Sequence, residues 1–147
     1  MTTDPILERD PKLRVVVERL AEAYQPERIY LFGSVARGEA DADSDYDVLI
    51  VVPDDAPPER RRSRLAYQVL RGTGTAVDAL VCTHGWFVAR AHLRASLPGT
   101  VLREGRLLHA ALPCARGRHQ GIVGTVADRE GTHKTGRIAG VAPWRVA

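Results

Sequence analysis

Acidic residues at every second position lead directly into an unbroken apolar segment, and this arrangement constrains the fold more than any other feature. The acids are Glu39, Asp41, Asp43, Asp45 and Asp47, and the segment that follows is Val48-Leu49-Ile50-Val51-Val52. The apolar segment predicts a buried strand over 45–52, which Pro53 ends. Carboxylates spaced this closely repel one another, so they must either remain in solvent or be neutralised by a cation.

Two of these acids are predicted to share one face of that strand with a third acid from elsewhere. Side chains two residues apart in a strand point the same way, about 7 Å apart at Cα, so Asp45 and Asp47 project together. Asp78 lies near the start of a second predicted strand, 76–83. If the two strands are neighbours, three carboxylates converge, as in two-metal sites for phosphoryl or nucleotidyl transfer. Mg²⁺ suits them, and Asp78 would accept the proton of the attacking hydroxyl.

A glycine–serine pair precedes the acids and predicts a turn that binds phosphate. Gly33 and Ser34 follow a predicted strand, 28–32, and open a helical turn. Glycine lets the backbone approach a phosphate closely, and free N–H groups at the start of such a turn bind anions. The Ser34 hydroxyl adds a donor, and Arg37 adds a charged donor. We therefore expect Gly33, Ser34 and Arg37 to bind the nucleotide.

The outer acids of the run are expected to have no part in the chemistry. Acid-rich loops are usually just solvated, and we expect this of Glu39, Asp41 and Asp43. A calcium loop of the EF-hand type is excluded, because Tyr46 stands where that pattern requires glycine and Val52 where it requires glutamate. Each remaining part of the site is also common in proteins without this chemistry, so the hypothesis depends on their joint placement.

The rest of the patterned chain predicts further helices and strands. Asp10 is placed as an N-cap for a helix from Pro11 to about Tyr24. The other predicted elements are helices over 59–70 and 85–97 and a short final strand over 107–110. Trp86 and Phe87 are expected in the core. The basic run Arg60-Arg61-Arg62 is expected to form a solvated face.

The end of the chain differs in composition from the rest. The 147 residues carry a net charge of +3, and those from Leu112 onward hold six Lys or Arg against two acids, a charge of +4. The remainder therefore carries about −1. Glycine is frequent in the tail, which has no sustained periodicity, so we expect a folded domain over 1–111 and a basic tail of low order over 112–147. A nucleic-acid partner is not expected, because binding needs a clustered basic face.

Targeting signals are not evident in the sequence. The N-terminal residues MTTDPILERD lack the apolar stretch of a signal peptide, and no apolar run approaches the roughly 20 residues of a membrane helix. Cys82 and Cys114 form no metal-binding spacing. We expect a cytoplasmic protein without a membrane partner.

The motif resembles a known signature. Gly33-Ser34, ten residues, then Asp45-Tyr46-Asp47 is similar to the GSx10DxD motif of the polymerase-β-like nucleotidyltransferases. The fuller string GSVARG…SDYDVLIVV resembles the minimal nucleotidyltransferases (MNT), which include the MntA-type antitoxins. The likeness runs from about Leu13 to Ala110. It implies an α/β (α+β) fold with a small mixed sheet flanked by helices, two Mg²⁺ ions, and transfer of a nucleoside monophosphate from an NTP.

The same resemblance implies roles for individual residues. By position, Asp45, Asp47 and Asp78 match the catalytic metal ligands, and Gly33 and Ser34 match the triphosphate-binding pair. MNT proteins of this kind are commonly antitoxins that transfer AMP from ATP to a tyrosine of a HEPN-domain RNase toxin. The chain has no evident acceptor-binding module of its own, which favours an acceptor supplied by such a partner.

Two alternatives remain open at this point. One is transfer of a nucleotide to a small molecule of the aminoglycoside type, which Asp41 and Asp43 would attract. The other is an antitoxin that acts by binding alone, although binding needs none of Asp45, Asp47 and Asp78. No residue specifies adenine over other bases.

Overall fold

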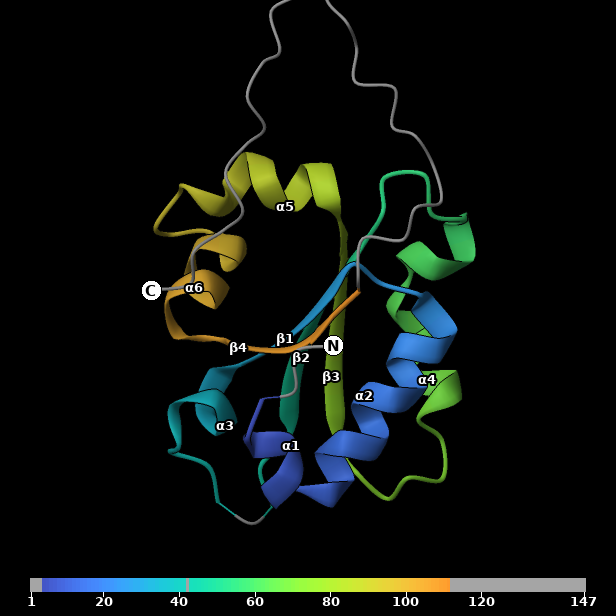
Figure 1. Ribbon diagram of the computed structural model, residues 1–147, viewed down its shortest axis with the longest axis vertical. Coiled ribbons are helices and arrows are strands. Elements are labelled where there is room, and N and C mark those ends of the chain that lie inside the picture. The colour runs from blue at the N-terminus through green and yellow to red at the C-terminus, as the bar shows by residue number, and fades with distance from the viewer. Residues whose placement is uncertain (1–3, 42, 112–147) are drawn as a thin grey trace, which may run out of the picture. The chain divides into compact units, whose positions relative to one another are not determined.

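The computed structural model describes residues 4–41 and 43–111 (Figure 1). The predicted basic tail, 112–147, lies outside the described residues, so its low order and the domain boundary before it stay predictions. The strands are β1 (Arg28–Phe32), β2 (Tyr46–Val52), β3 (Val77–Thr83) and β4 (Arg106–Ala110). The α-helices are α1 (Ile6–Arg9), α2 (Pro11–Tyr24), α3 (Gly33–Arg37), α4 (Ser63–Val69), α5 (His84–Ala91) and α6 (Leu97–Glu104), and a 3-10 helix, η1, spans Pro58–Arg61.

The four strands form one mixed sheet in the order β3-β2-β1-β4. β1 is antiparallel to both β2 and β4, whereas β2 and β3 are parallel. A parallel pair needs a crossover connection, and η1 and α4 supply it between β2 and β3. The predicted fold class, a small mixed sheet flanked by helices, is confirmed.

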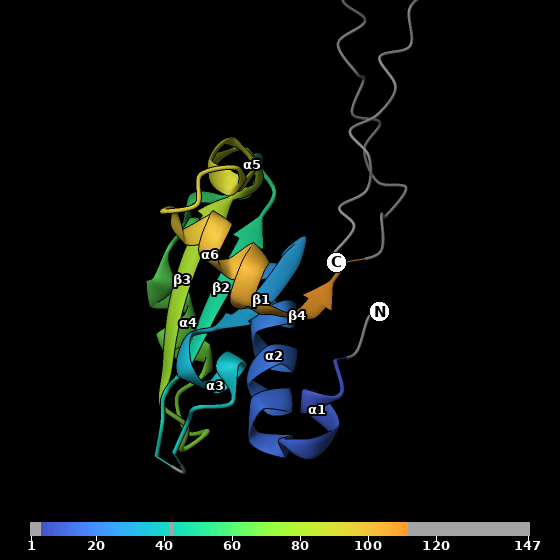
Figure 2. The ribbon, with the colours of Figure 1, turned by 90° about the vertical axis from the view of Figure 1, so that its left-hand side faces the viewer.

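Helices cover both faces of the sheet. In Figure 1, α2 and α4 lie together on one side and α6 lies on the other, and Figure 2 looks onto the face that α6 covers. Val48, Ile50 and Val52 of β2 belong to the core cluster that contains the buried side chains of α2 and α4. Leu49 and Val51 pack in a second cluster with Phe87 of α5 and Val101 of α6. Residues 48–52 of β2 are buried on both faces, and this part of the strand is therefore apolar without interruption.

Two predicted helices are in fact broken, and this corrects the sequence analysis. The predicted helix 59–70 is divided at Arg62, whose backbone is extended, into η1 and α4. The predicted helix 85–97 ends at Ala91, and α6 begins after Ser96, whose hydroxyl accepts a hydrogen bond from the N–H of Gly99 at 3.1 Å. An N-cap of this kind starts a new helix where the hydrophobic pattern alone suggests the end of an old one.

The prediction that Trp86 and Phe87 both lie in the core is confirmed for Phe87 and wrong for Trp86. Phe87 is 2% exposed and stacks on Tyr30 with ring centroids 5.6 Å apart, as expected of a core residue. Trp86 is 39% exposed. Adjacent helix positions point about 100° apart, so one of the two faces the sheet while the other lies at its margin.

No helix in the ranges 4–41 and 43–111 is long and apolar enough to cross a membrane.

The hydroxyl of Tyr24 links Arg62, at the break between η1 and α4, to Ala66 in α4. We expect this hydroxyl to contribute measurably to stability. The hydroxyl donates a hydrogen bond to the carbonyl of Arg62 at 2.6 Å and accepts one from the N–H of Ala66 at 2.8 Å. Tyr24→Phe leaves both backbone groups without this partner, so the free energy of unfolding should fall by about 1–3 kcal/mol in urea titration. The control is Tyr67→Phe, at a position 56% exposed. Equal stability of the two variants would contradict this role.

Candidate active site

The pairing of β2 with β3 brings two of the predicted acids together. The strands are parallel, and Asp47 lies directly opposite Asp78 in the register. Neighbouring strands run about 4.8 Å apart, and residues in register project from the same face. The condition on which the sequence hypothesis depended, that the two acid-bearing strands are neighbours, is therefore met. Asp45 lies one residue before β2, and its side chain is exposed.

The charges of Asp45 and Asp78 both act on the carboxyl of Asp47. Asp47 is half-buried, whereas Asp78 is exposed on the outer strand. Burial raises the pKa of the Asp47 carboxyl above its usual value, and the charges of Asp78 and then Asp45 raise that pKa further. Arg37 acts in the opposite direction. The protein environment therefore disfavours the charged form of Asp47.

These acids fit a divalent cation by their chemistry. Within residues 4–41 and 43–111, no group of three His, Cys, Asp or Glu side chains is close enough to form a metal site as it stands. The candidate donors are all carboxylate oxygens, which Mg²⁺ prefers, and the repulsion that raises the pKa of Asp47 is what a bound cation relieves. The assignment of Asp45, Asp47 and Asp78 as catalytic metal ligands stays a prediction.

Gly33 sits directly against Asp47, and only glycine fits there. It is the first residue of α3, and its φ is +73°, a backbone conformation that other residues rarely adopt. A Cβ at this position would lie 3.1 Å from Cγ of Asp47 and closer still to its Oδ2. The fold thus places the Gly33-Ser34 turn beside Asp47, one of the three predicted metal ligands. Nucleotide binding by Gly33 and Ser34 stays a prediction.

Arg37, the third predicted nucleotide-binding residue, is held by two carboxylates. Its Nε donates to Oε2 of Glu39 at 3.0 Å, and its Nη1 lies 3.8 Å from Oε2 of Glu104 in α6. The hydrogen bond to Glu39 is the main cause that raises the pKa of the Arg37 guanidinium. Glu39 is exposed, as are Asp41 and Asp43. A guanidinium has five N–H donors, and Arg37 is exposed, so it keeps donors for a phosphate while it contacts both carboxylates.

A cavity at the start of β2 and β3 is lined in part by residues that were not predicted from the sequence to belong to the site. Its volume is about 470 Å³, and Asp45 and Asp78 line it together with Tyr67, Arg71 and Thr75. Arg71 brings a positive charge to a cavity that two acids also line. No motif marks Arg71 or Thr75. Their one signal is position, because both lie in the glycine-containing loop directly before β3.

Comparison with known families decides the class of protein. A model of the nucleotidyltransferase domain family matches residues 13–107. The chain belongs to this family. The match spans well over half of the chain and contains all six predicted site residues, so the expected family is confirmed and the protein is a nucleotidyltransferase. No curated protein matches the chain.

Solved structures with a similar chain include toxin–antitoxin complexes. One is a toxin–antitoxin with AMP-PNP, at 24% identity and a TM-score of 0.45, covering 66% of this chain and 73% of that one. Another is a tri-AMPylated Shewanella oneidensis HEPN toxin in complex with its MNT antitoxin, at 20% identity and a TM-score of 0.43, covering 68% and 71%. A third is a candidate nucleotidyltransferase from Sulfolobus solfataricus, at 24% identity and a TM-score of 0.46, covering 68% and 78%. Likeness at this level assigns neither a substrate nor a partner.

Proposed function

We propose that this nucleotidyltransferase transfers AMP from ATP to a hydroxyl of a partner protein, a tyrosine of a cognate HEPN-domain toxin, and so acts as its antitoxin. Family membership supports nucleotidyl transfer. The resemblance of GSVARG…SDYDVLIVV to the MNT antitoxins supports AMP as the group and a toxin as the acceptor. The observation that carries the proposal is the placement of Asp47 opposite Asp78, with Gly33 packed against Asp47.

In this proposal each residue has a defined task. Bound Mg²⁺ ions would lower the pKa of the attacking hydroxyl and balance the charge of the leaving pyrophosphate. Asp45 and Asp47 would hold the metal together with the triphosphate, and the Gly33-Ser34 turn would bind the terminal phosphates through its N–H groups and hydroxyl. The acceptor oxygen bonds to the α-phosphorus, the bond from that phosphorus to pyrophosphate breaks, and the proton of the hydroxyl passes to Asp78 and then to solvent.

The openness of the site favours a macromolecular acceptor. Asp45 and Asp78 are both exposed, and Asp78 lies on β3, the outermost strand on its side of the sheet. The cavity that Asp45 and Asp78 line is open to solvent, so a large acceptor can reach both carboxylates. A small molecule needs enclosure to gain affinity, so an aminoglycoside-type acceptor is the less favoured alternative. Both ATP and Mg²⁺ are plentiful in the cytoplasm, where we place the reaction.

The proposal is tested by mass spectrometry of the two proteins together. The purified chain is incubated with the protein encoded by its neighbouring gene, Mg²⁺ and each NTP in turn. We expect the partner to gain one or more AMP units with ATP, and no gain with the Asp45→Ala/Asp47→Ala variant. No gain with any nucleotide would refute protein adenylylation. Neutralisation of the partner by an Asp45/Asp47/Asp78 triple alanine variant would show that binding alone suffices.

A further inference from the structure

The outer edge of β3 is unoccupied by any other described strand. β3 ends the sheet order, and β2 is its one neighbour there. Outside the β2–β3 ladder, no hydrogen bond between described residues reaches the backbone of residues 77–81. In a parallel pair, alternate residues direct their N–H and C=O groups away from the neighbour. β3 therefore presents a row of free backbone donors and acceptors, and edges of this kind pair with other strands.

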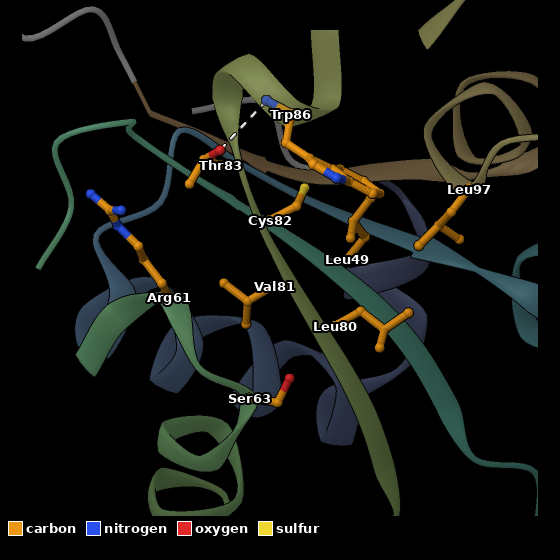
Figure 3. A pocket seen from close by; sticks show the side chains of 9 residues that line it. All are labelled: Leu49, Arg61, Ser63, Leu80, Val81, Cys82, Thr83, Trp86 and Leu97. Carbon is orange, nitrogen blue, oxygen red and sulfur yellow. Dashed lines mark hydrogen bonds between the residues drawn. The ribbon is translucent and has the colours of Figure 1, made fainter. Parts of the chain in front are cut away.

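A pocket of about 390 Å³ runs along this edge. Four consecutive residues, Leu80 to Thr83, line it, together with Leu49, Trp86 and others (Figure 3). Consecutive strand residues point to opposite faces, so they line one pocket only where that pocket follows the edge at which both faces meet. Leu80 is 38% exposed and Trp86 is 39% exposed. The edge thus combines free backbone groups with apolar side chains that are open to a partner.

The lining of the pocket carries a positive charge. Among the described residues that line it, the one charged side chain is Arg61. Hydrogen bonds to the carbonyl oxygens of Ala56 and Asp54, at 2.7 and 2.6 Å, hold the Arg61 guanidinium in place. Arg61 is exposed, as expected of a solvated basic run, and it also lines this pocket. Arg90 adds a second cation, 4.6 Å above the ring of Trp86. The complementary occupant has an apolar side chain and a carboxylate.

The pocket adjoins the predicted site on the same face of the sheet. Leu49 lies two residues after Asp47, and Leu80 lies two residues after Asp78, so the pocket begins about 7 Å along the strands from the acids. Transfer at phosphorus proceeds with the attacking and leaving oxygens in line. With pyrophosphate at the Gly33 turn beside Asp47, the acceptor must enter from the opposite side, which is the side of β3.

We propose that the acceptor polypeptide docks on the free edge of β3 and adds to the sheet as an extended strand. One apolar side chain of this strand fills the pocket at Leu80 and Trp86, and a neighbouring carboxylate meets Arg61. The hydroxyl that receives AMP belongs to a residue about two positions along the strand, which places it beside Asp78. The acceptor and its hydroxyl rest on the proposed function, whereas the free edge and its pocket are features of the fold itself.

The test compares two leucine-to-lysine variants with the protein encoded by the neighbouring gene as the probe. Leu80→Lys puts a charge on the free edge, where lysine opposes strand addition. Leu93→Lys is the matched control, because Leu93 is 48% exposed and does not line the pocket. We expect Leu80→Lys to raise the Kd of the partner at least tenfold in calorimetry and to reduce AMP transfer in parallel. The control and the Asp45→Ala/Asp47→Ala variant should bind like the wild type.

Hydrogen exchange separates strand addition from other kinds of docking. On partner binding, the amides of residues 77–81 should become protected in the wild type. Protection confined to other segments would overturn strand addition, and so would a Leu80→Lys variant that binds and transfers normally. Binding that depends on Leu80 without any transfer would refute the proposed function but support the docking surface. If the wild type does not bind the probe at all, the docking proposal fails.

Discussion

Asp47→Asn is expected to abolish nucleotidyl transfer while leaving the fold at least as stable as the wild type. The carboxylate of Asp47 is half-buried, and this burial raises its pKa, which the charges of Asp78 and Asp45 raise further. Removing its charge relieves this repulsion and removes a predicted metal ligand in the same step. The rate should fall on the order of 10²–10³-fold or more, since single groups that stabilise transition-state charge have effects of this size. In the wild type, the carboxylate of Asp47 would therefore lower the stability of the fold while it serves the reaction.

Two measurements check this separation of activity from stability. Transfer is followed by mass spectrometry at saturating ATP and Mg²⁺, and the melting temperature is measured without either. Asp43→Asn serves as the control, because Asp43 is exposed and lies in the loop before the strand. The control should change neither quantity. A melting temperature that drops sharply in Asp47→Asn would show that the carboxylate supports the fold and would contradict this account.

Gly33→Ala should damage both the fold and the reaction. At φ +73°, any side chain strains the backbone, which costs about 1–2 kcal/mol. The added methyl group also collides with the carboxylate of Asp47, so either that side chain or the turn must move. A displacement of about 1 Å in a catalytic group lowers rates by about 10²-fold. We expect a loss of transfer of that order and a fall of about 1–3 kcal/mol in the free energy of unfolding.

Gly38 offers a matched control for the two effects of this substitution. Its φ is +74°, nearly that of Gly33, but nothing lies within 4 Å of where its Cβ would stand. Gly38→Ala therefore introduces the same backbone strain without the collision. It should lower stability and leave transfer nearly unchanged. If the two variants lose transfer equally, the contact between Gly33 and Asp47 has no part in the reaction.

The two proposals place the nucleotide and the acceptor on different sides of the predicted site. The predicted metal and nucleotide sites lie at the start of β2 and in the turn beside it, next to strand residues that are buried on both faces. The acceptor approaches from the outermost strand on that side, where the sheet is open. Under the two proposals, nucleotide binding and acceptor recognition would therefore use different parts of the sheet.

Several elements could be predicted from the sequence because their signals are local. The predicted bounds of α2, Pro11 and Tyr24, agree with the structure, since an N-cap aspartate, a proline in the first turn and regular apolar spacing all favour one helix. The strand 28–32 is equally well marked by its β-rich residues and the glycine that follows. The breaks at Arg62 and after Ala91 were missed for different reasons. At the first, the hydrogen bond to the carbonyl of Arg62 comes from Tyr24, which is distant in the sequence. At the second, the hydroxyl of Ser96 bonds nearby carbonyl groups and caps α6, a local signal that the hydrophobic pattern hides.

The sequence by itself determined which residue types the site contains and their order along the chain. The pair Gly33-Ser34, the spacing of ten residues and the alternation of Asp45 and Asp47 are chemical facts of the primary structure, and they identified the family. The tertiary structure decided what spacing along the chain cannot encode. It placed Asp78, 31 positions after Asp47, directly opposite that residue, because only the pairing of β2 with β3 sets their register. It also left one edge of β3 open beside the acids, because the order of strands in a sheet depends on long-range packing.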